Sequence, residues 1–388
     1  MSAGSSISGL QYQNPVSYQQ QWNLGLEHAF TRSLTFTMNY VGGHGVHLPI
    51  SARPNDLQPA YFGGVGDTNQ VSYLQQQVTN PFYSVASSLA PGSLLRNPTV
   101  QRAQLLTAFP QYTSGSISGI QNYSLGLSYL DKGSATYNAL QTSLLIHGQG
   151  GMTGSISYVF SKLMGNVSDL TNGFLNATGN PGIQNYYFLH QQEHSLLATD
   201  TPHRFTGTIA LPIPVGTGKR FGGDLPGWAN KIVGDWSVNT IVLVNSGFPL
   251  SFTVTGAPAF AGTRPMWVPG VSPLTSGSTH NRLGGNGQKL GYLNPAAFAL
   301  PVAFQLGNVP RSTGLTRGPI YFDDSLSLIK NIPIHGDWSL ELRGEAFNVI
   351  NKAAFSMPNT TVGSSSFGYI TSQANSPRNI QLGAKIHF

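Results

Sequence analysis

Three short segments carry residue types whose spacing could support catalysis or ligand binding. His190-Gln-Gln-Glu-His194 has the spacing with which two histidines on one helical face bind Zn²⁺ while the glutamate acts as a base. That chemistry needs a helix and a further acidic ligand. The segment instead lies in a Tyr-, Asn- and Gly-rich stretch, and the next Glu downstream is Glu341. We therefore expect a loop with exposed histidines and no metal site.

Two further segments match known catalytic or phosphate-binding motifs only in part. Asp200 and His203 could belong to a Ser-His-Asp triad, but the chain has no Gly-x-Ser-x-Gly elbow. Gly216-Thr-Gly-Lys219 is a poor phosphate loop, because Arg220 stands where Ser or Thr would hold Mg²⁺. We expect a turn in both places. The sequence therefore predicts no catalytic residue, no cofactor and no metal ligand, and the protein is not expected to be an enzyme.

The composition excludes most other classes of protein. The 388 residues include 46 Gly, no Cys and 9% charged side chains, whereas globular proteins average about 25% charged residues. With 40% hydrophobic and 11% aromatic residues, the chain can fold, and with four Glu and eight Lys it is a poor candidate for a helical array. No apolar run approaches the roughly 18 residues of a transmembrane helix. An outer-membrane β-barrel has this profile.

Charge and the start of the chain add two expectations. The net charge is +6, but the Lys and Arg residues are scattered, whereas nucleic-acid binding needs them on one face. We therefore expect no nucleic-acid partner. Residues Met1 to Leu10 have neither a basic n-region nor an apolar h-region, so no signal peptide is predicted there.

Strict alternation of apolar and polar residues recurs along the whole chain and predicts β-strands with one apolar face. Most of the segments have the roughly 9–11 residues that cross a bilayer when tilted. The nine predicted strands are Tyr18–Phe30, Ser33–Val41, Tyr137–His147, Met152–Ser161, His203–Leu211, Trp236–Val244, Ile320–Lys330, Trp338–Asn348 and Asn379–Phe388.

The connections between these strands alternate between short and long, with long ones at residues 42–136, 162–202, 245–319 and 350–378. Outer-membrane barrels have short periplasmic turns and long extracellular loops, with an apolar outside and a polar lumen. We therefore expect Leu24, Leu26, Leu34 and Phe36 to face outward. The residues expected on the interior face are Asn23, Glu27, Thr35, Gln141, Ser155, Arg343 and Lys385.

Several segments resemble, in order, the Oar-like group of TonB-dependent outer-membrane receptors, which carry a carboxypeptidase-regulatory-like domain. The closing segment Ser376–Phe388 (SPRNIQLGAKIHF) resembles the terminal strand of these receptors. The other matching segments are Tyr18–Leu26, Tyr40–Leu48, Ala135–Leu140, Ile156–Lys162, Asp200–Phe205, Asn245–Phe248, Asn294–Phe298 and Glu345–Phe355.

The resemblance implies a 22-stranded barrel with an internal plug and active uptake across the outer membrane. Residues 1–388 are then expected to be the C-terminal portion of the barrel, about nine or ten strands, with no plug domain. They would supply the structural wall and extracellular loops for substrate uptake, and TonB would be contacted only through missing N-terminal parts. Two alternatives stay open, namely a stand-alone small porin or adhesin and a soluble all-β enzyme or lectin.

The expected partners are outer-membrane lipid, lipopolysaccharide and the barrel-assembly machinery. The resemblance implies that the final strand is the assembly signal, formed by Ile380, Leu382, Ala384, Ile386 and Phe388. Arginines in the long connections are expected to pair with lipid phosphate; these are Arg53, Arg96, Arg102, Arg264, Arg282, Arg311 and Arg317. Because the number of predicted strands is odd, we also expect the first and last strands not to close a barrel with each other.

Overall fold

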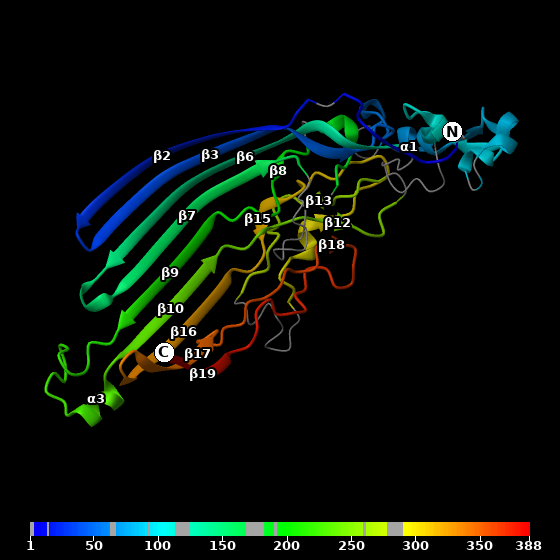
Figure 1. Ribbon diagram of the computed structural model, residues 1–388. Helices are drawn as coiled ribbons and strands as arrows, with labels where there is room; N and C mark the ends of the chain where they lie inside the picture. Colours follow the sequence, from blue (N-terminus) through cyan, green and yellow to red (C-terminus); the bar gives the residue numbers. More distant parts are fainter. Residues whose placement is uncertain are drawn as a thin grey trace.

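The computed structural model describes residues 4–13, 15–62, 67–89, 91, 93–112, 125–167, 182–189, 192–258, 261–277 and 290–388. Within them, nine long strands form one antiparallel sheet in which each strand pairs with its neighbours along the chain (Figure 1). In order they are β2 (Tyr18–Thr31), β3 (Leu34–Ala52), β6 (Leu125–His147), β7 (Thr153–Gly165), β9 (His203–Pro212), β10 (Trp236–Asn245), β16 (Tyr321–His335), β17 (Trp338–Phe347) and β19 (Asn379–His387). Each predicted segment overlaps one of these strands, so the prediction of an all-β fold is confirmed.

Shorter strands pair with this sheet or form small sheets within the long connections. The strand β1 (Ile7–Leu10) pairs in parallel with β6, and β8 (Ser195–Leu196) pairs with β7. Four two-stranded sheets lie in the long connections: β4 (Gln77–Thr79) with β5 (Thr99–Gln101), β11 (Pro249–Leu250) with β15 (Thr313–Arg317), β12 (Thr253–Val254) with β18 (Thr361–Val362), and β13 (Met266–Trp267) with β14 (Phe298–Ala299).

The helices are short and lie outside the sheet. The α-helices are α1 (Thr68–Gln75), α2 (Arg102–Leu105) and α3 (Gly227–Val233), and the 3-10 helices are η1 (Pro59–Tyr61), η2 (Tyr83–Ser88), η3 (Leu94–Arg96), η4 (Pro110–Tyr112), η5 (Gln149–Gly151), η6 (Tyr186–Phe188) and η7 (Pro295–Ala297). In the described part of the chain, no helix has the length and apolar character that crossing a membrane requires.

The strand registers give the sheet one apolar and one polar face. Residues directly opposite each other on antiparallel strands share a face. Leu24 lies opposite Tyr40, Tyr40 opposite Leu140, and Leu140 opposite Phe160. On the other face, Thr37, Ser143, Ser157 and Thr206 lie opposite one another in turn. The same registers place Asn23, Glu27, Thr35, Gln141, Ser155, Arg343 and Lys385 together on the polar face, as predicted.

The described residues place no second layer over the apolar face. Leu24 is 75% exposed and Leu382 is 86% exposed, and Leu26 is also exposed. Leu34 and Phe36 are half-buried among their neighbours on the same face. The clusters of buried hydrophobic residues lie in the long connections and in the ends of β3 and β6 that lead into them. An apolar face of this extent without a covering layer fits a surface that lipid solvates.

The connections differ at the two ends of the sheet, as the sequence predicts. Arg32–Ser33, residues 148–152, residues 213–235 and Gly336–Asp337 join strands at one end. Gly336 has φ 57°, a left-handed conformation that glycine adopts without a steric penalty and that a two-residue hairpin requires. Figure 1 shows α1 and the strands β12, β13 and β18 of the long connections at the opposite end from α3.

The sheet is open, because its end strands β2 and β19 each pair with one long strand in the described structure. The expectation that the first and last strands do not pair with each other is confirmed. Their outer edges carry unpaired backbone N–H and C=O groups, and in lipid each such group costs several kcal/mol. Strand pairing must therefore cover both edges in a membrane.

The two faces can be compared by placing arginine at adjacent positions of β6. Leu144 on the apolar face and Ser143 on the polar face are both half-buried and lie at nearly the same depth. We expect Leu144→Arg to lower the free energy of unfolding by about 2–4 kcal/mol, because it places a charge in lipid. Ser143→Arg is the matched control and should cost far less. Denaturant unfolding of the intact protein in lipid vesicles measures both, and equal losses would contradict the assignment of the faces.

Candidate functional site

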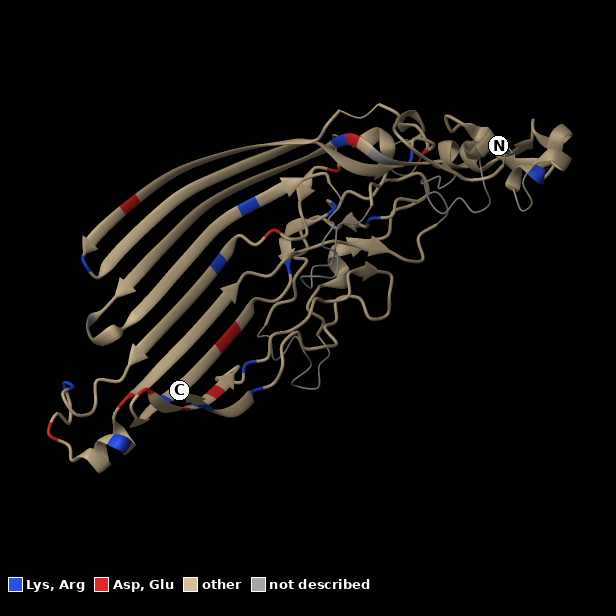
Figure 2. Cartoon of the chain, viewed as in Figure 1, with Lys and Arg blue, Asp and Glu red and all other residues tan. Residues whose placement is uncertain are grey.

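One cluster of charged side chains lies in the layer of long connections and another on the polar face of β17. Figure 2 shows that charged residues are few along the strands themselves. The layer of long connections, called the loop layer here, comprises the described residues between β3 and β6, β7 and β9, β10 and β16, and β17 and β19. It holds the buried hydrophobic clusters, of which the largest surrounds Phe252 and Phe298, whose ring centroids lie 4.7 Å apart. The connections are therefore packed against one another.

The centre of the loop layer is a buried ion-pair cluster around Glu193. Arg264 Nη2 lies 2.9 Å from Glu193 Oε1, and Arg311 Nε lies 3.5 Å from Glu193 Oε2. All three side chains are at most 1% exposed. One carboxylate therefore faces two guanidiniums away from water, where an ion pair has to offset a large cost of desolvation.

Gln184 extends this cluster and joins two connections that are distant in sequence. Its backbone N–H donates to Glu193 Oε1 at 3.0 Å. Its side-chain oxygen accepts from the backbone N–H groups of Arg264 and Gly307, and its Nε2 donates to the Gly307 carbonyl. A fully buried amide thus holds residues of the β7–β9 connection against residues of the β10–β16 connection.

The electrostatics of the cluster depend on Glu193. Burial lowers the pKa of Arg264 and of Arg311 from the ordinary value, and the charge of Glu193 acts in the opposite direction on both. A lowered pKa means that burial disfavours the charged arginines, so the folded loop layer gains nothing from burying them alone. The carboxylate of Glu193 is the group that makes their burial tolerable.

The structure corrects the expectation of pairing with lipid phosphate for Arg264 and Arg311, and the expectation stays untested for the other loop arginines. Arg264 and Arg311 are buried against Glu193 and cannot reach a lipid. Arg317 pairs with the buried Asp200 at 2.6 Å. Arg53 and Arg96 donate to the carbonyls of Ile183 and Leu89, Arg102 lies over the ring of Tyr73, and Arg282 lies outside the described residues. Spacing could not show the ion pairs of Arg264 and Arg317, because their partners lie 71 and 117 residues away.

In two of the three segments considered for catalysis, the described side chains are held by other partners. His190 and Gln191 lie outside the described residues, and Glu193, the base of the zinc motif, is held by two arginines. Asp200 accepts from the backbone of Leu163 and pairs with Arg317, whereas His203 contacts Tyr158 at 2.7 Å. No group of three or more His, Asp or Glu side chains that could hold a metal ion occurs in the described parts of the chain.

The polar face carries a charged group on β17 that is paired yet accessible. Arg343 Nη2 lies 2.8 Å from Glu341 Oε1, and Arg343 Nη1 lies 3.5 Å from Glu345 Oε1. The Arg343 side chain is 42% exposed. Lys385 of β19 lies opposite Glu341 in the register. The exposure of this group indicates a surface that water reaches, not a packed core. Ion pairs that water reaches contribute little to stability.

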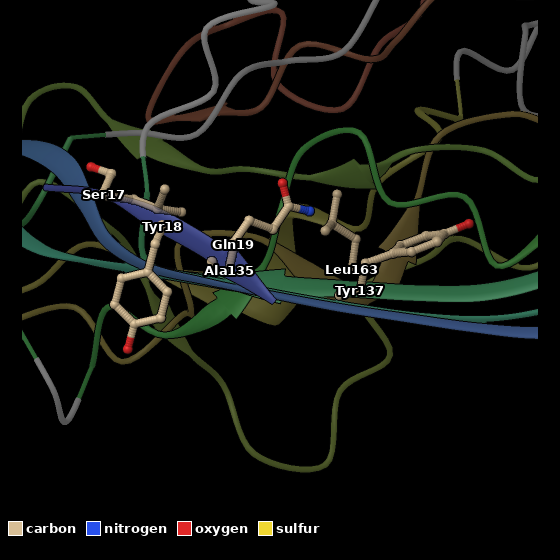
Figure 3. A pocket seen from close by; sticks show the side chains of 9 residues that line it. Ser17, Tyr18, Gln19, Ala135, Tyr137 and Leu163 are labelled. Carbon is tan, nitrogen blue, oxygen red and sulfur yellow. The ribbon is translucent and has the colours of Figure 1, made fainter. Parts of the chain in front are cut away.

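A pocket of about 330 Å³ opens where β2, β3, β6 and β7 enter the loop layer. Gln19, Gly43, Tyr137 and Leu163 line it together with neighbouring residues. Gly43 lies opposite Tyr137, and a side chain at Gly43 would meet Gln19 first. Figure 3 shows Gln19 and Leu163 on one side of the sheet and Tyr18 on the other. The pocket is therefore lined from the polar face by amide, phenol and aliphatic groups, whereas Tyr18, which also lines it, lies on the other face.

The final strand presents the residues predicted as an assembly signal in one row. Ile380, Leu382, Ala384 and Ile386 lie opposite Ala346, Gly344, Leu342 and Leu340 on the apolar face. Phe388 is 90% exposed, and its ring centroid lies 5.8 Å from that of Trp338. The residues thus form an exposed apolar stripe with aromatic rings at the turn end of the sheet.

Comparison with known proteins agrees with this architecture. The family model described as "Outer membrane beta barrel domain" matches residues 1–381. The chain belongs to this family. This outer-membrane barrel protein is located in the outer membrane, and its uncovered apolar face is the surface that contacts the bilayer. The sheet is the part of the barrel wall that the chain supplies.

The remaining comparisons add less. No curated protein matches this barrel chain. Among solved structures, the outer membrane transporter YddB from Escherichia coli is similar, with 9% sequence identity and a TM-score of 0.45. The match covers 99% of this chain and 34% of the transporter chain. The chain therefore spans about a third of the length of that protein.

The role of Glu193 in the barrel protein can be tested by removing its charge. We expect Glu193→Gln to destabilise the loop layer by about 3–5 kcal/mol, because Arg264 and Arg311 keep buried charges without a counter-ion. Hydrogen exchange of the backbone at residues 182–189 and 261–277 should accelerate, while exchange in the sheet stays unchanged. Glu27→Gln, on exposed β2, is the control. Unchanged exchange in the loop layer would contradict this role.

Proposed function

We propose that the chain is the C-terminal part of the barrel of an Oar-like TonB-dependent receptor, which takes up a substrate across the outer membrane. The observation that carries the proposal is the open sheet, whose polar face lies beneath a packed loop layer while β2 and β19 keep free edges. Such edges require further strands in lipid. The complete barrel would have 22 strands, as the resemblance of the segments to this group implies.

In this proposal the chain acts as a structural wall and not as an enzyme. The long connections face the cell exterior and lipopolysaccharide, the apolar face contacts lipid, and the polar face lines the lumen. The pocket around Gln19 and Tyr137 lies at the loop end of that lumen. It is placed where a substrate held by the loops would enter. TonB contact and the plug belong to parts of the receptor outside these 388 residues.

The final strand is the proposed signal for the barrel-assembly machinery. Support comes from the exposed stripe of Ile380, Leu382, Ala384 and Ile386 and from the terminal Phe388. A free edge on β19 lets another strand pair with its backbone. The machinery could therefore recognise both the edge and the aromatic end.

Disulfide trapping distinguishes the receptor from a small barrel closed on itself. The chain has no Cys, so pairs can be introduced cleanly, one on β2 (Gln21→Cys, Asn23→Cys or Gly25→Cys) and one on β19 (Gln381→Cys, Gly383→Cys or Lys385→Cys). We expect no intramolecular disulfide in the intact protein, because other strands separate the edges. Glu345→Cys with Gln381→Cys, which lie opposite each other, is the positive control. Efficient β2–β19 cross-linking would indicate a stand-alone porin or adhesin.

Dependence on TonB needs a separate test on the intact protein. We expect the purified periplasmic domain of TonB to co-elute with the intact protein, because the receptor is energised through that contact. Residues 1–388 folded alone should not bind it. Absence of binding by the intact protein, in an assay where a known TonB-dependent receptor binds, would refute the proposed uptake mechanism.

A further inference from the structure

The connection between β9 and β10, residues 213–235, differs from the other turns at its end of the sheet. It contains α3, whereas Arg32–Ser33 and Gly336–Asp337 are simple two-residue turns. Figures 1 and 2 show it projecting beyond the strands, with Lys and Arg residues along it. We call residues 213–235 the α3 turn.

The α3 turn has a defined fold of its own. Val215 and Phe221 form a β-bridge, and the Phe221 backbone N–H donates to the Pro214 carbonyl. Asn230 of α3 holds the two limbs together, because its Oδ1 accepts from the Thr217 backbone N–H at 2.7 Å. Its backbone carbonyl accepts from the Gly234 N–H at 2.8 Å. The side chains on the outside of the turn are therefore presented by a fixed scaffold.

Those outward side chains are unusually apolar for a turn. Trp228 is 72% exposed, Ile232 is 62% exposed and Phe221 is 55% exposed. Trp228 and Ile232 lie four residues apart and so share one face of α3. Exposed aromatic and aliphatic groups gathered in this way mark a surface that contacts another phase or molecule.

The turn is joined to the apolar face of the sheet. Trp236, the first residue of β10, lies opposite Lys330 on that face. Trp236 Nε1 donates to the Ile232 carbonyl at 3.0 Å, and Lys330 Nζ donates to the Gly234 carbonyl. The end of α3 thus lies on the side that contacts the bilayer. The apolar surface of the turn continues the lipid-facing surface of the barrel.

The α3 turn carries a small net positive charge. Lys219, Arg220 and Lys231 are exposed together with Asp224 and Asp235, so the turn has three cations and two carboxylates. The Arg220 guanidinium lies 5.5 Å from the centre of the Phe221 ring. Aromatic residues beside cations are enriched at membrane–water interfaces, where rings lie at headgroup depth and cations contact phosphates. The ring of Trp236 lies 5.6 Å from Nζ of Lys330, a buried lysine that ties the turn to the sheet and does not face the headgroups.

We propose that the α3 turn is an interfacial anchor that lies in the headgroup layer of the phospholipid leaflet at the turn end of the barrel. Trp228, Ile232 and Phe221 insert at the boundary with the acyl chains, while Lys219, Arg220 and Lys231 contact lipid phosphates. The anchor fixes the depth of β9 and β10 in the membrane. It applies equally to a receptor and to a stand-alone barrel, so it does not rest on the proposed uptake function.

Spin labelling tests the depth of the turn directly. Single-cysteine variants Trp228→Cys and Ile232→Cys carry a nitroxide, and Asp337→Cys in the β16–β17 turn is the water-facing control. The intact protein is reconstituted in vesicles of phosphatidylethanolamine and phosphatidylglycerol, and heat-modifiable migration confirms folding. We expect labels at 228 and 232 to be more accessible to oxygen and less accessible to a water-soluble nickel chelate than the label at 337. Equal nickel accessibility at all three positions would overturn the proposal.

A second measurement keeps Trp228 and Ile232 intact. A label at Ala229, next to Trp228 on α3, reports depth while Lys219, Arg220 and Lys231 are replaced together by Gln. We expect this change, or a change to purely zwitterionic vesicles, to raise nickel accessibility at position 229. A label that stays accessible in every vesicle and is protected only after a periplasmic extract is added would show a protein partner instead. That result would also overturn the proposal.

Discussion

The pairing of backbone N–H and C=O groups is the constraint on which the whole structure depends. In hydrocarbon these groups have no water to bind, so each long strand must pair with a neighbour on both sides. Strands that follow one another along the chain pair in sequence from β2 to β19, which meets the constraint everywhere except at the two outer edges. These two edges are the places where the sheet needs further strand pairing in lipid.

Because lipid and lumen occupy the two faces of the sheet, the hydrophobic core of this protein lies elsewhere. Phe252, Phe298 and their neighbours pack in the loop layer, where water is excluded by the connections themselves. Packing of the connections also buries the charged side chains of Arg264 and Arg311. Both form ion pairs with the buried carboxylate of Glu193. The loops are therefore held in a fixed arrangement at one end of the sheet.

At the turn end of the sheet, large apolar side chains are exposed, whereas in the loop layer they are buried. Most turns there are minimal, but the α3 turn places Trp228 and Ile232 outside and is tied to Trp236 and Lys330 on the bilayer-facing side. Apolar groups are thus exposed where lipid is near and buried where the chain meets water. One rule, the removal of apolar surface from water, accounts for both ends.

The sequence by itself determined the strands, the faces and the alternation of connection lengths. Period-two patterning is a local property, so Leu24 and Asn23 could be assigned to opposite faces without knowing any partner. The partners of Glu193 and Asp200 could not be found in this way, because Arg264 and Arg317 lie 71 and 117 residues away. Arginines and carboxylates in long connections are usually exposed to solvent, and the spacing around Glu193 resembled a zinc-binding motif instead of an ion pair. Only the tertiary structure decided that these charges are buried, since burial depends on which distant connections pack together.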